Sequence, residues 1–495
     1  MGVVIRQSIF TSIMAYAGVV IGYINLLYLY PAYLTTEQIG LLRTILDAAL
    51  LFAPFAQAGL AQSITRFYPH FNSTGRQASS FVTTMLLFSF FAFLIFSVLL
   101  FSFKDAVLSL FGNKAEVLSP YLHVVLWLTA SFMFMAVIEA YSRSLLKVAF
   151  PNFVREVFTR LLQALLVFFY FLEFISFHQL ITGHIFIYAG AAAILLLSLI
   201  LPGHFTLRFD KTVIQSAHLP EIFRFSSLSF ISSGSMALIG KIDSLMVAGM
   251  TGFTANAIYT TSFYIATVIE IPKRAMSQTV MPLIAQAFKD HNLHEIERLY
   301  KSVSINLFIV GALLLIGISA NLHNVYALMP KGETFEQGFY VVFLIGLGKL
   351  IDMLFGPSSE IIVLSRYYAF NIILLMTLAL VVILLNLILI PAYGITGAAI
   401  GSCAAMLIFN AVKYFFIWYK FRIQPFSLAT LKVFSISLLT VFVNYLIPEK
   451  NAVIPDMMLR SFLITLVFGS LIILTKCSED MNRMLNRIIS QLKGN

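Results

Sequence analysis

Charged residues are scarce in this chain of 495 residues, and their scarcity excludes an ordinary soluble protein. Asp, Glu, Lys and Arg make up 11% of the sequence, whereas 60% is hydrophobic and the mean hydropathy is +0.91. A soluble domain carries roughly 25% charged residues. Cysteine is also rare, because the sequence contains only Cys403 and Cys477. A disulfide framework is therefore excluded.

The sequence also lacks the short motifs of several enzyme classes. It contains no G-x-x-x-x-G-K-[ST] phosphate loop, which argues against ATP hydrolysis, and no His-Glu-x-x-His metal motif. Gly346-Leu347-Gly348-Lys349 has the wrong spacing and lies in an apolar segment. His291 and His294 lie in a polar loop and do not predict a metal site. We expect no cofactor, no metal and no catalytic residues.

Hydrophobic segments of membrane-spanning length recur along nearly the whole chain. A hydrocarbon core about 30 Å thick needs roughly 20 apolar residues per helical crossing, and lipid offers the backbone no hydrogen-bond partners. We therefore predict an all-α polytopic membrane protein with fourteen transmembrane helices. The predicted ranges are 8–31, 41–64, 81–103, 118–139, 156–176, 183–202, 225–249, 254–275, 299–321, 338–357, 367–389, 394–419, 428–446 and 457–476. The weakest are 156–176 and 254–275, which carry charges.

The distribution of Lys and Arg predicts the orientation of these helices. Positive residues accumulate on the cytoplasmic side of a membrane protein. With both ends in the cytoplasm, 24 of the 32 Lys and Arg residues fall in cytoplasmic segments and 6 fall outside. The net charge of +10 thus requires no nucleic-acid partner. The first apolar segment is too long for a cleaved signal peptide and has no persuasive cleavage site.

Two landmarks suggest an internal repeat. Thr36 precedes Pro54 by eighteen residues, and Thr254 precedes Pro272 by the same interval. The offset of 218 residues matches one six-helix unit followed by another, related by an axis along the membrane normal. Both prolines could equally be ordinary kinks, which membrane helices tolerate.

Three stretches resemble the multidrug/oligosaccharidyl-lipid/polysaccharide (MOP) flippase superfamily, and within it the Wzx-type polysaccharide exporters. The first combines Leu34–Leu42 (LTTEQIGLL) with Ala58–Leu60 and Arg66–Pro69 (RFYP), the second joins Lys241–Gly249 (KIDSLMVAG) to Ala257–Tyr259, and the third is Asn386–Ile400 (NLILIPAYGITGAAI). The similarity covers roughly the first 420 residues. Ala257 departs from the pattern, because many relatives have glycine there.

The resemblance implies two six-helix lobes arranged as a V around a cavity that opens alternately to each side. We place the lobes at 1–210 and 211–424, two additional helices at 425–476, and an amphipathic cytoplasmic tail at 477–495. The implied cargo is an oligosaccharide repeat unit of O-antigen, capsule or exopolysaccharide, carried on a polyprenyl pyrophosphate. The implied location is the bacterial inner membrane, and a polysaccharide polymerase or export complex is the candidate protein partner.

Charged side chains inside the predicted spans are the candidate functional residues, because each costs about 2.5–3.5 kcal/mol at the membrane centre on insertion scales. The candidates for binding the anionic cargo are Arg43, Lys241, Arg274 and Lys349, and the candidates for binding a coupling H⁺ or Na⁺ are Asp47, Asp243, Glu270 and Asp352.

Structural alternatives remain for several of these charges. Arg43 could extend to the outer headgroups, Arg274 could be a cytoplasmic anchor, and Lys349 could neutralise Asp352 at i,i+3 on one helix. Lys241 lies several turns inside its span, and Asp243 two residues later points to another side of the helix.

A run of serines on the seventh span offers two interpretations. Six serines lie between Ser226 and Ser235. Their hydroxyls could line a polar path for sugars, which do not cross hydrocarbon cheaply. Alternatively, these small residues could allow close helix packing.

Three other functions compete with flipping of a lipid-linked oligosaccharide. A drug/cation antiporter of the same superfamily usually has twelve spans, so the additional pair argues against it. A membrane polymerase or ligase is expected to carry a sizeable outer loop, which this sequence lacks. A purely structural membrane protein would not need charges such as Lys241 and Lys349.

Overall fold

Helices provide the regular structure in the part of the chain that the structure describes. The computed structural model describes residues 2–71, 75–210, 213, 215–216, 218–448, 452–478, 480 and 482–483. No β-strand occurs within these ranges. The predicted all-α class is confirmed.

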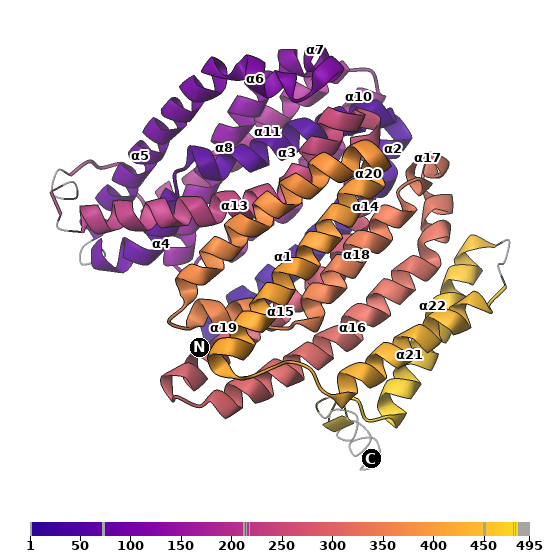
Figure 1. Cartoon of the computed structure of the whole chain (residues 1–495). Coiled ribbons are helices and arrows are strands. Elements are labelled where there is room, and N and C mark those ends of the chain that lie inside the picture. The colour runs from indigo at the N-terminus through magenta and orange to yellow at the C-terminus, as the bar shows by residue number, and fades with distance from the viewer. Residues whose placement is uncertain are drawn as a thin grey trace. The chain divides into compact units, whose positions relative to one another are not determined.

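The helices fall into two series (Figure 1). The first comprises α1 (Gly2–Ile24), α2 (Tyr30–Tyr33), α3 (Thr36–Ala56), α4 (Leu60–Phe71), α5 (Gly75–Ser102), α6 (Lys104–Ser109), α7 (Ala115–Leu118), α8 (Leu122–Ser144), α9 (Ala149–Phe153), α10 (Thr159–Phe171), α11 (Phe177–Ile200) and α13 (Leu219–Thr251). The second comprises α14 (Phe253–Thr267), α15 (Ile271–Lys289), α16 (Leu293–Leu328), α17 (Gly332–Glu336), α18 (Phe339–Leu354), α19 (Ser358–Leu364), α20 (Tyr368–Phe421), α21 (Leu428–Tyr445) and α22 (Val453–Leu474). Short π turns (Asn25–Leu29, Val154–Phe158) and 3₁₀ turns (Gly112–Lys114, Ser119–Tyr121, Val268–Glu270) join some of them.

Ten helices in the described chain are long and apolar enough to cross a membrane. An eleventh span arises if α18 and α19, which meet at a 51° bend, are counted together. The weak predictions 156–176 and 254–275 fall on α10 and α14, which have only 13 and 15 residues. A π turn precedes α10 and a 3₁₀ turn follows α14, so each predicted span is interrupted. The multi-span class is confirmed, whereas the count of fourteen stays a prediction.

The chain divides into two compact units, residues 1–257 and 258–495. These units are groups of neighbouring residues and need not coincide with transport lobes. The predicted lobes 1–210 and 211–424 and the additional pair 425–476 therefore stay predictions. Most of the predicted tail 477–495 lies outside the described residues.

The first unit has an apolar core between α4, α5, α8 and α11. The rings of Phe71 and Phe81 stack there with centroids 4.4 Å apart, and Phe81 and Tyr141 are fully buried or nearly so. The opposite side of α5 exposes large apolar side chains, including Phe91 and Val98. Because lipid tails are as apolar as these side chains, this surface suits a membrane environment.

Small residues let the backbones of the first unit approach closely. A Cβ added to Gly40 on α3 would lie 1.7 Å from the carbonyl oxygen of Phe253, and one added to Gly59 would lie 2.2 Å from that of Ser226. The Ser226 hydroxyl lies 2.7 Å from that of Ser63 on α4. Ser233 and other serines of the run donate to backbone carbonyls of α13. These contacts favour the packing interpretation of the serine run at this point of α13.

In the second unit, α16 is one helix of 36 residues that extends beyond both ends of the predicted ninth span, 299–321. The side chain of Asn292 caps it by accepting from the Glu295 N–H at 3.0 Å. Helices α21 and α22 pack on α16 (Figure 1). Asp456 on α22 accepts from Arg460 at 2.6 Å and from Asn324 on α16 at 2.7 Å. The hydrogen bond from Asn324 thus fixes α22 to α16, while the buried ion pair with Arg460 lies within α22.

Helix α20 folds back on itself at Gly394. This glycine has φ 57° and ψ −136°, a conformation that side-chain-bearing residues rarely adopt. Beyond the bend the two arms touch, because a Cβ added to Gly397 would lie 2.0 Å from the Leu389 carbonyl oxygen. The predicted boundary between 367–389 and 394–419 therefore lies at this bend.

We expect Gly397→Ala to destabilise the protein by about 2 kcal/mol, because the added methyl group collides with a backbone atom that cannot rotate away. The measurement is the apparent melting temperature of the purified protein in detergent. Gly190→Ala in α11 is the matched control, since a Cβ there would meet no described atom within 4 Å. Better helix propensity should stabilise this control by up to about 1 kcal/mol. Equal melting temperatures for the two variants would contradict the close contact.

Candidate functional site

A buried ion pair joins α3 to α13 in the first unit. The Lys241 Nζ atom lies 2.6 Å from Oδ1 of Asp47, and the side chains are 22% and 6% exposed. Both residues are sequence candidates, one for binding cargo and the other for binding a coupling ion. The structure brings them together although 194 residues separate them in the chain. In lipid an unpaired charge is costly, so each partner lowers the cost of burying the other.

The second carboxylate oxygen of Asp47 belongs to a hydrogen-bonded chain. The hydroxyl oxygen of Ser244 lies 2.7 Å from Asp47 Oδ2 and 2.9 Å from Asn256 Oδ1. Asn256 in turn donates to the Thr44 hydroxyl at 2.9 Å, and Thr44 donates to the Gly40 carbonyl at 2.8 Å. The single hydroxyl hydrogen of Ser244 can serve only one of its two acceptors at a time. A proton on Asp47 would add a second donor to this chain.

A second charge cluster lies in the second unit, where Glu270 accepts from Arg274 at 3.2 Å and from Lys349. Nearby, Asp352 accepts from Lys273 at 2.5 Å. The carboxylate of Asp352 also lies 3.6 Å from the ammonium of Lys413, which is fully buried.

Lys413 connects the two sides of the break between α18 and α19. Its ammonium approaches Asp352 on α18 and donates to the Ser359 hydroxyl on α19 at 3.0 Å. It also lies 4.3 Å from the ring centroid of Phe409, a favourable cation–π distance. On α15, Ser277 donates to Glu360 of α19. The bend is thus stabilised by charges from three helices.

The sequence candidates are therefore only partly grouped as expected. Arg274 contacts Glu270 four residues before it in the chain. Lys349 contacts Glu270 on another helix, so neutralisation of Lys349 by Asp352 at i,i+3 is not the contact found. Arg43 lies over the Tyr30 ring at 5.5 Å. Asp243 is buried on α13. That these charges line one cavity stays a prediction.

Sequence reasoning missed the contribution of Lys273 and Lys413, because the distribution of Lys and Arg assigns both to cytoplasmic segments. Lys413 lies inside the predicted span 394–419, and this position was the available signal. The ion-pair partner of each lysine lies on a different helix, so no spacing rule could identify it.

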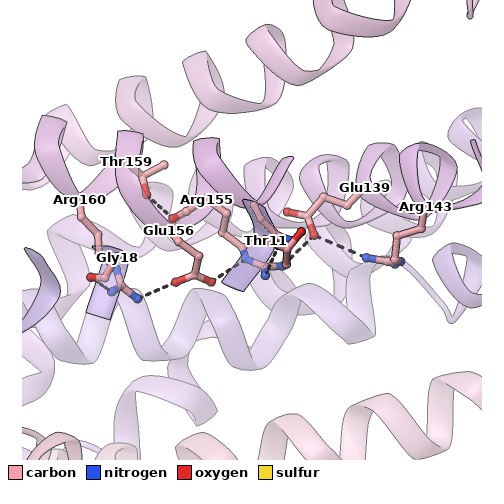
Figure 2. Close-up of polar contacts among 9 residues, drawn as sticks. Thr11, Gly18, Glu139, Arg143, Arg155, Glu156, Thr159 and Arg160 are labelled. Carbon is pink, nitrogen blue, oxygen red and sulfur yellow. Dashed lines mark hydrogen bonds and ion pairs between the residues drawn. The ribbon is translucent and has the colours of Figure 1, made fainter. Parts of the chain in front are cut away.

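A third charge cluster was also missed, in which Glu139 and Arg143 on α8 adjoin Arg155 and Glu156 of the π turn before α10 (Figure 2). Arg160 on α10 binds Glu156 at 2.9 Å and donates to the Gly18 carbonyl on α1. The available signals were the i,i+4 spacings of Glu139 with Arg143 and of Glu156 with Arg160.

This cluster also stabilises the π turn. Thr159 donates its N–H to the Val154 carbonyl, as a π turn requires, and its hydroxyl donates to the Arg155 carbonyl at 2.7 Å. The side chain thereby satisfies a carbonyl that an α-helix would pair with the N–H. Asn25 of the other π turn, directly after α1, donates to the Arg160 carbonyl at 2.8 Å. π turns are frequent at functional sites.

Comparison with solved structures gives the fold family. The chain resembles the lipid II flippase MurJ in an inward closed conformation, with 15% identity over 93% of this chain and 98% of that one and a TM-score of 0.75. It also resembles an inward-facing multidrug resistance MATE family transporter, with 14% identity, coverage of 84% and 94%, and a TM-score of 0.63. A MOP superfamily transporter from Pyrococcus furiosus matches with 15% identity, coverage of 85% and 95%, and a TM-score of 0.58.

A comparison with curated proteins gives no match. A family model described as "Polysaccharide biosynthesis protein" matches residues 4–288, which is more than half of the chain. This match agrees with the MOP-type fold and covers the first two of the three stretches that carried the sequence resemblance. The chain therefore belongs to the polysaccharide biosynthesis protein family of the MOP flippase superfamily.

Proposed function

We propose that this protein flips a polyprenyl-pyrophosphate-linked oligosaccharide from the cytoplasmic to the outer leaflet by alternating access. The repeat unit belongs to O-antigen, capsule or exopolysaccharide, and the protein lies in the bacterial inner membrane with both termini in the cytoplasm. Two six-helix lobes enclose the cavity, and α21 and α22 are the additional pair. A polymerase or export complex would receive the product. The observation that carries the mechanism is the buried Lys241–Asp47 pair.

The runner-up function is drug/cation antiport. MATE-type transporters cover about 84–85% of this chain, whereas the flippase MurJ covers 93%. This difference is expected if the chain has helices beyond the twelve of an antiporter. The family match to polysaccharide biosynthesis proteins also supports the lipid-linked cargo.

In the proposed mechanism, Lys241 alternates between two anionic partners. In the structure its ammonium binds Asp47. The pyrophosphate of the cargo is a stronger acceptor, because its charge is spread over several oxygens that accept charge-assisted hydrogen bonds. Cargo binding would draw Lys241 away from Asp47 and release the link between α3 and α13. Recognition of the anion is thereby coupled to helix movement, with Arg43 and Arg274 as further cationic contacts.

Proton binding at Asp47 would favour the same release. A neutral Asp47 attracts Lys241 less, and its new O–H can donate to Ser244, whose hydroxyl then donates to Asn256. Both contacts of Ser244 then carry a hydrogen, which favours burial of the neutral acid. Asp47 is therefore the first candidate for the coupling proton. The remaining candidates for binding H⁺ or Na⁺ are Glu270, Asp352 and Asp243. Ion binding at Glu270 would release Lys349, which could then contact the cargo.

We expect Lys241→Ala to reduce flipping at least tenfold, because a charge-assisted hydrogen bond contributes about 1.5–3 kcal/mol. Lys241→Arg should retain part of the activity, since it keeps the positive charge. The measurement is translocation of a lipid-linked oligosaccharide in proteoliposomes. Lys289→Ala, an exposed lysine at the end of α15, is the control and should behave as wild type. Wild-type rates in both Lys241 variants would remove this residue from the mechanism.

We expect Asp47→Asn to abolish the response of flipping to a pH gradient. The amide resembles the protonated acid in charge, so Lys241 is already released and no proton can bind. One pH unit corresponds to 1.36 kcal/mol, so an acidic exterior one unit below the interior should accelerate the wild type by up to about tenfold. Glu333→Gln, an exposed acid on α17, should respond as wild type does. A gradient response that persists in Asp47→Asn would move coupling to the cluster around Glu270 and Asp352.

A further inference from the structure

One buried carboxylate orients two arginines at the end of α8. Oε2 of Glu139 lies 2.9 Å from Nη1 of Arg155 and 3.7 Å from Nη1 of Arg143. The carboxylate side chain is 9% exposed, whereas the two arginine side chains are 46% and 49% exposed. Figure 2 shows the two guanidinium groups approaching Glu139 from opposite sides. The carboxylate is thus buried, whereas the two guanidinium groups are accessible from outside the protein.

The exposed guanidinium groups of Arg143 and Arg155 have N–H donors beyond those used in the contacts described, and the cluster has a net positive charge. A guanidinium carries five N–H donors. The contact described for Arg143 is the single ion pair with Glu139, and Arg155 has further contacts to Glu156 and Asn152 at 3.0 Å. The group contains the guanidiniums of Arg143, Arg155 and Arg160 and the carboxylates of Glu139 and Glu156, so positive charge exceeds negative by one. Lys147 lies four residues after Arg143, beyond the end of α8, and its ammonium contacts the ring of His204.

We propose that Arg143 and Arg155, oriented by Glu139, bind the phosphate group of a membrane-anchored lipid. Guanidinium groups present paired N–H donors whose geometry fits phosphate oxygens. The charge alternation predicts that this end of α8 is cytoplasmic, where the cargo would enter and where anionic phospholipids supply phosphate. A phospholipid headgroup and a polyprenyl pyrophosphate share this chemistry. Binding of polyprenyl pyrophosphate rests on the proposed function, and binding of a phospholipid does not. In the first case the cargo would bind at this site before it reaches Lys241.

The buried acid separates this site from ordinary positive-inside anchoring. Lysines and arginines that only determine helix orientation by the positive-inside rule need no acidic partner in the protein interior. Here Glu139 is buried at an energetic cost that the two arginines offset. Fixed orientation of the donors lowers the entropy lost when an anion binds. The site should therefore depend on the shape of the guanidinium and not on its charge alone.

The test measures lipid binding to the purified full-length protein in detergent by native mass spectrometry. The probes are polyprenyl pyrophosphate, phosphatidylglycerol, and diacylglycerol as a lipid without phosphate. Arg143→Lys and Arg155→Lys keep the charge but lose the paired donors. Each should weaken binding of the phosphate lipids about tenfold and leave diacylglycerol binding unchanged. Arg208→Lys, in an exposed loop, is the matched control and should bind as wild type.

A second variant distinguishes loss of binding from loss of folding. If Arg155→Lys lowers the melting temperature, the double variant Arg155→Gln with Glu139→Gln removes one charge of each sign and leaves no unpaired buried acid. It should show the same tenfold loss. Selective loss of polyprenyl pyrophosphate binding identifies the cargo as the source, and equal loss of phosphatidylglycerol binding identifies phospholipid; either result supports the site. Unchanged phosphate-lipid binding in the lysine variants and in the double variant would overturn it. The proposed function is judged separately, by flipping in the wild type.

Discussion

The cost of placing charge in hydrocarbon is the constraint on which the rest of this structure depends. A soluble protein can leave a lysine in water, but a membrane helix must provide it with a partner. Lys241 has Asp47, Lys349 has Glu270, Lys273 has Asp352, and Arg460 has Asp456. Three of these four pairs join different helices. Charge therefore contributes to tertiary structure here in a way that apolar packing cannot, because lipid competes equally well for apolar surface.

The same constraint decides how much the sequence could predict. Apolar segments of spanning length are visible without knowledge of any contact, so the all-α membrane class and most helix positions follow from composition and length. The bend of α20 at Gly394 was also predictable, because glycine lies there between two apolar runs. The interruptions before α10 and after α14 were not, since π and 3₁₀ turns depend on local contacts such as the bond from Thr159 to the Arg155 carbonyl.

Side-chain partners were the least predictable feature, for a physical reason. Sequence spacing identifies neighbours on one helix, such as Arg274 and Glu270 at i,i+4. It also suggested that Lys349 and Asp352 neutralise each other, whereas the structure pairs each of them with residues of another helix. A contact across 194 residues, such as Lys241 with Asp47, depends on how helices pack and leaves no periodic signal. The intramembrane charges could be named from the sequence, but their partners could not.

Exchange of partners gives these ion pairs a role beyond stability. A pair that is simply structural should be insulated from solvent on both sides, as Arg460 and Asp456 are, with side chains 8% and 4% exposed. Lys241 differs, because its side chain is 22% exposed while that of Asp47 is 6% exposed. The same asymmetry, with an accessible cation on a hidden acid, recurs at Arg143 and Arg155 on Glu139. A hidden acid is held by protein, whereas an accessible cation can be approached by another anion. In this proposed scheme, a phosphate-bearing lipid moves by replacing one acid after another as the partner of a basic side chain, and each replacement frees a helix contact that the acid had maintained.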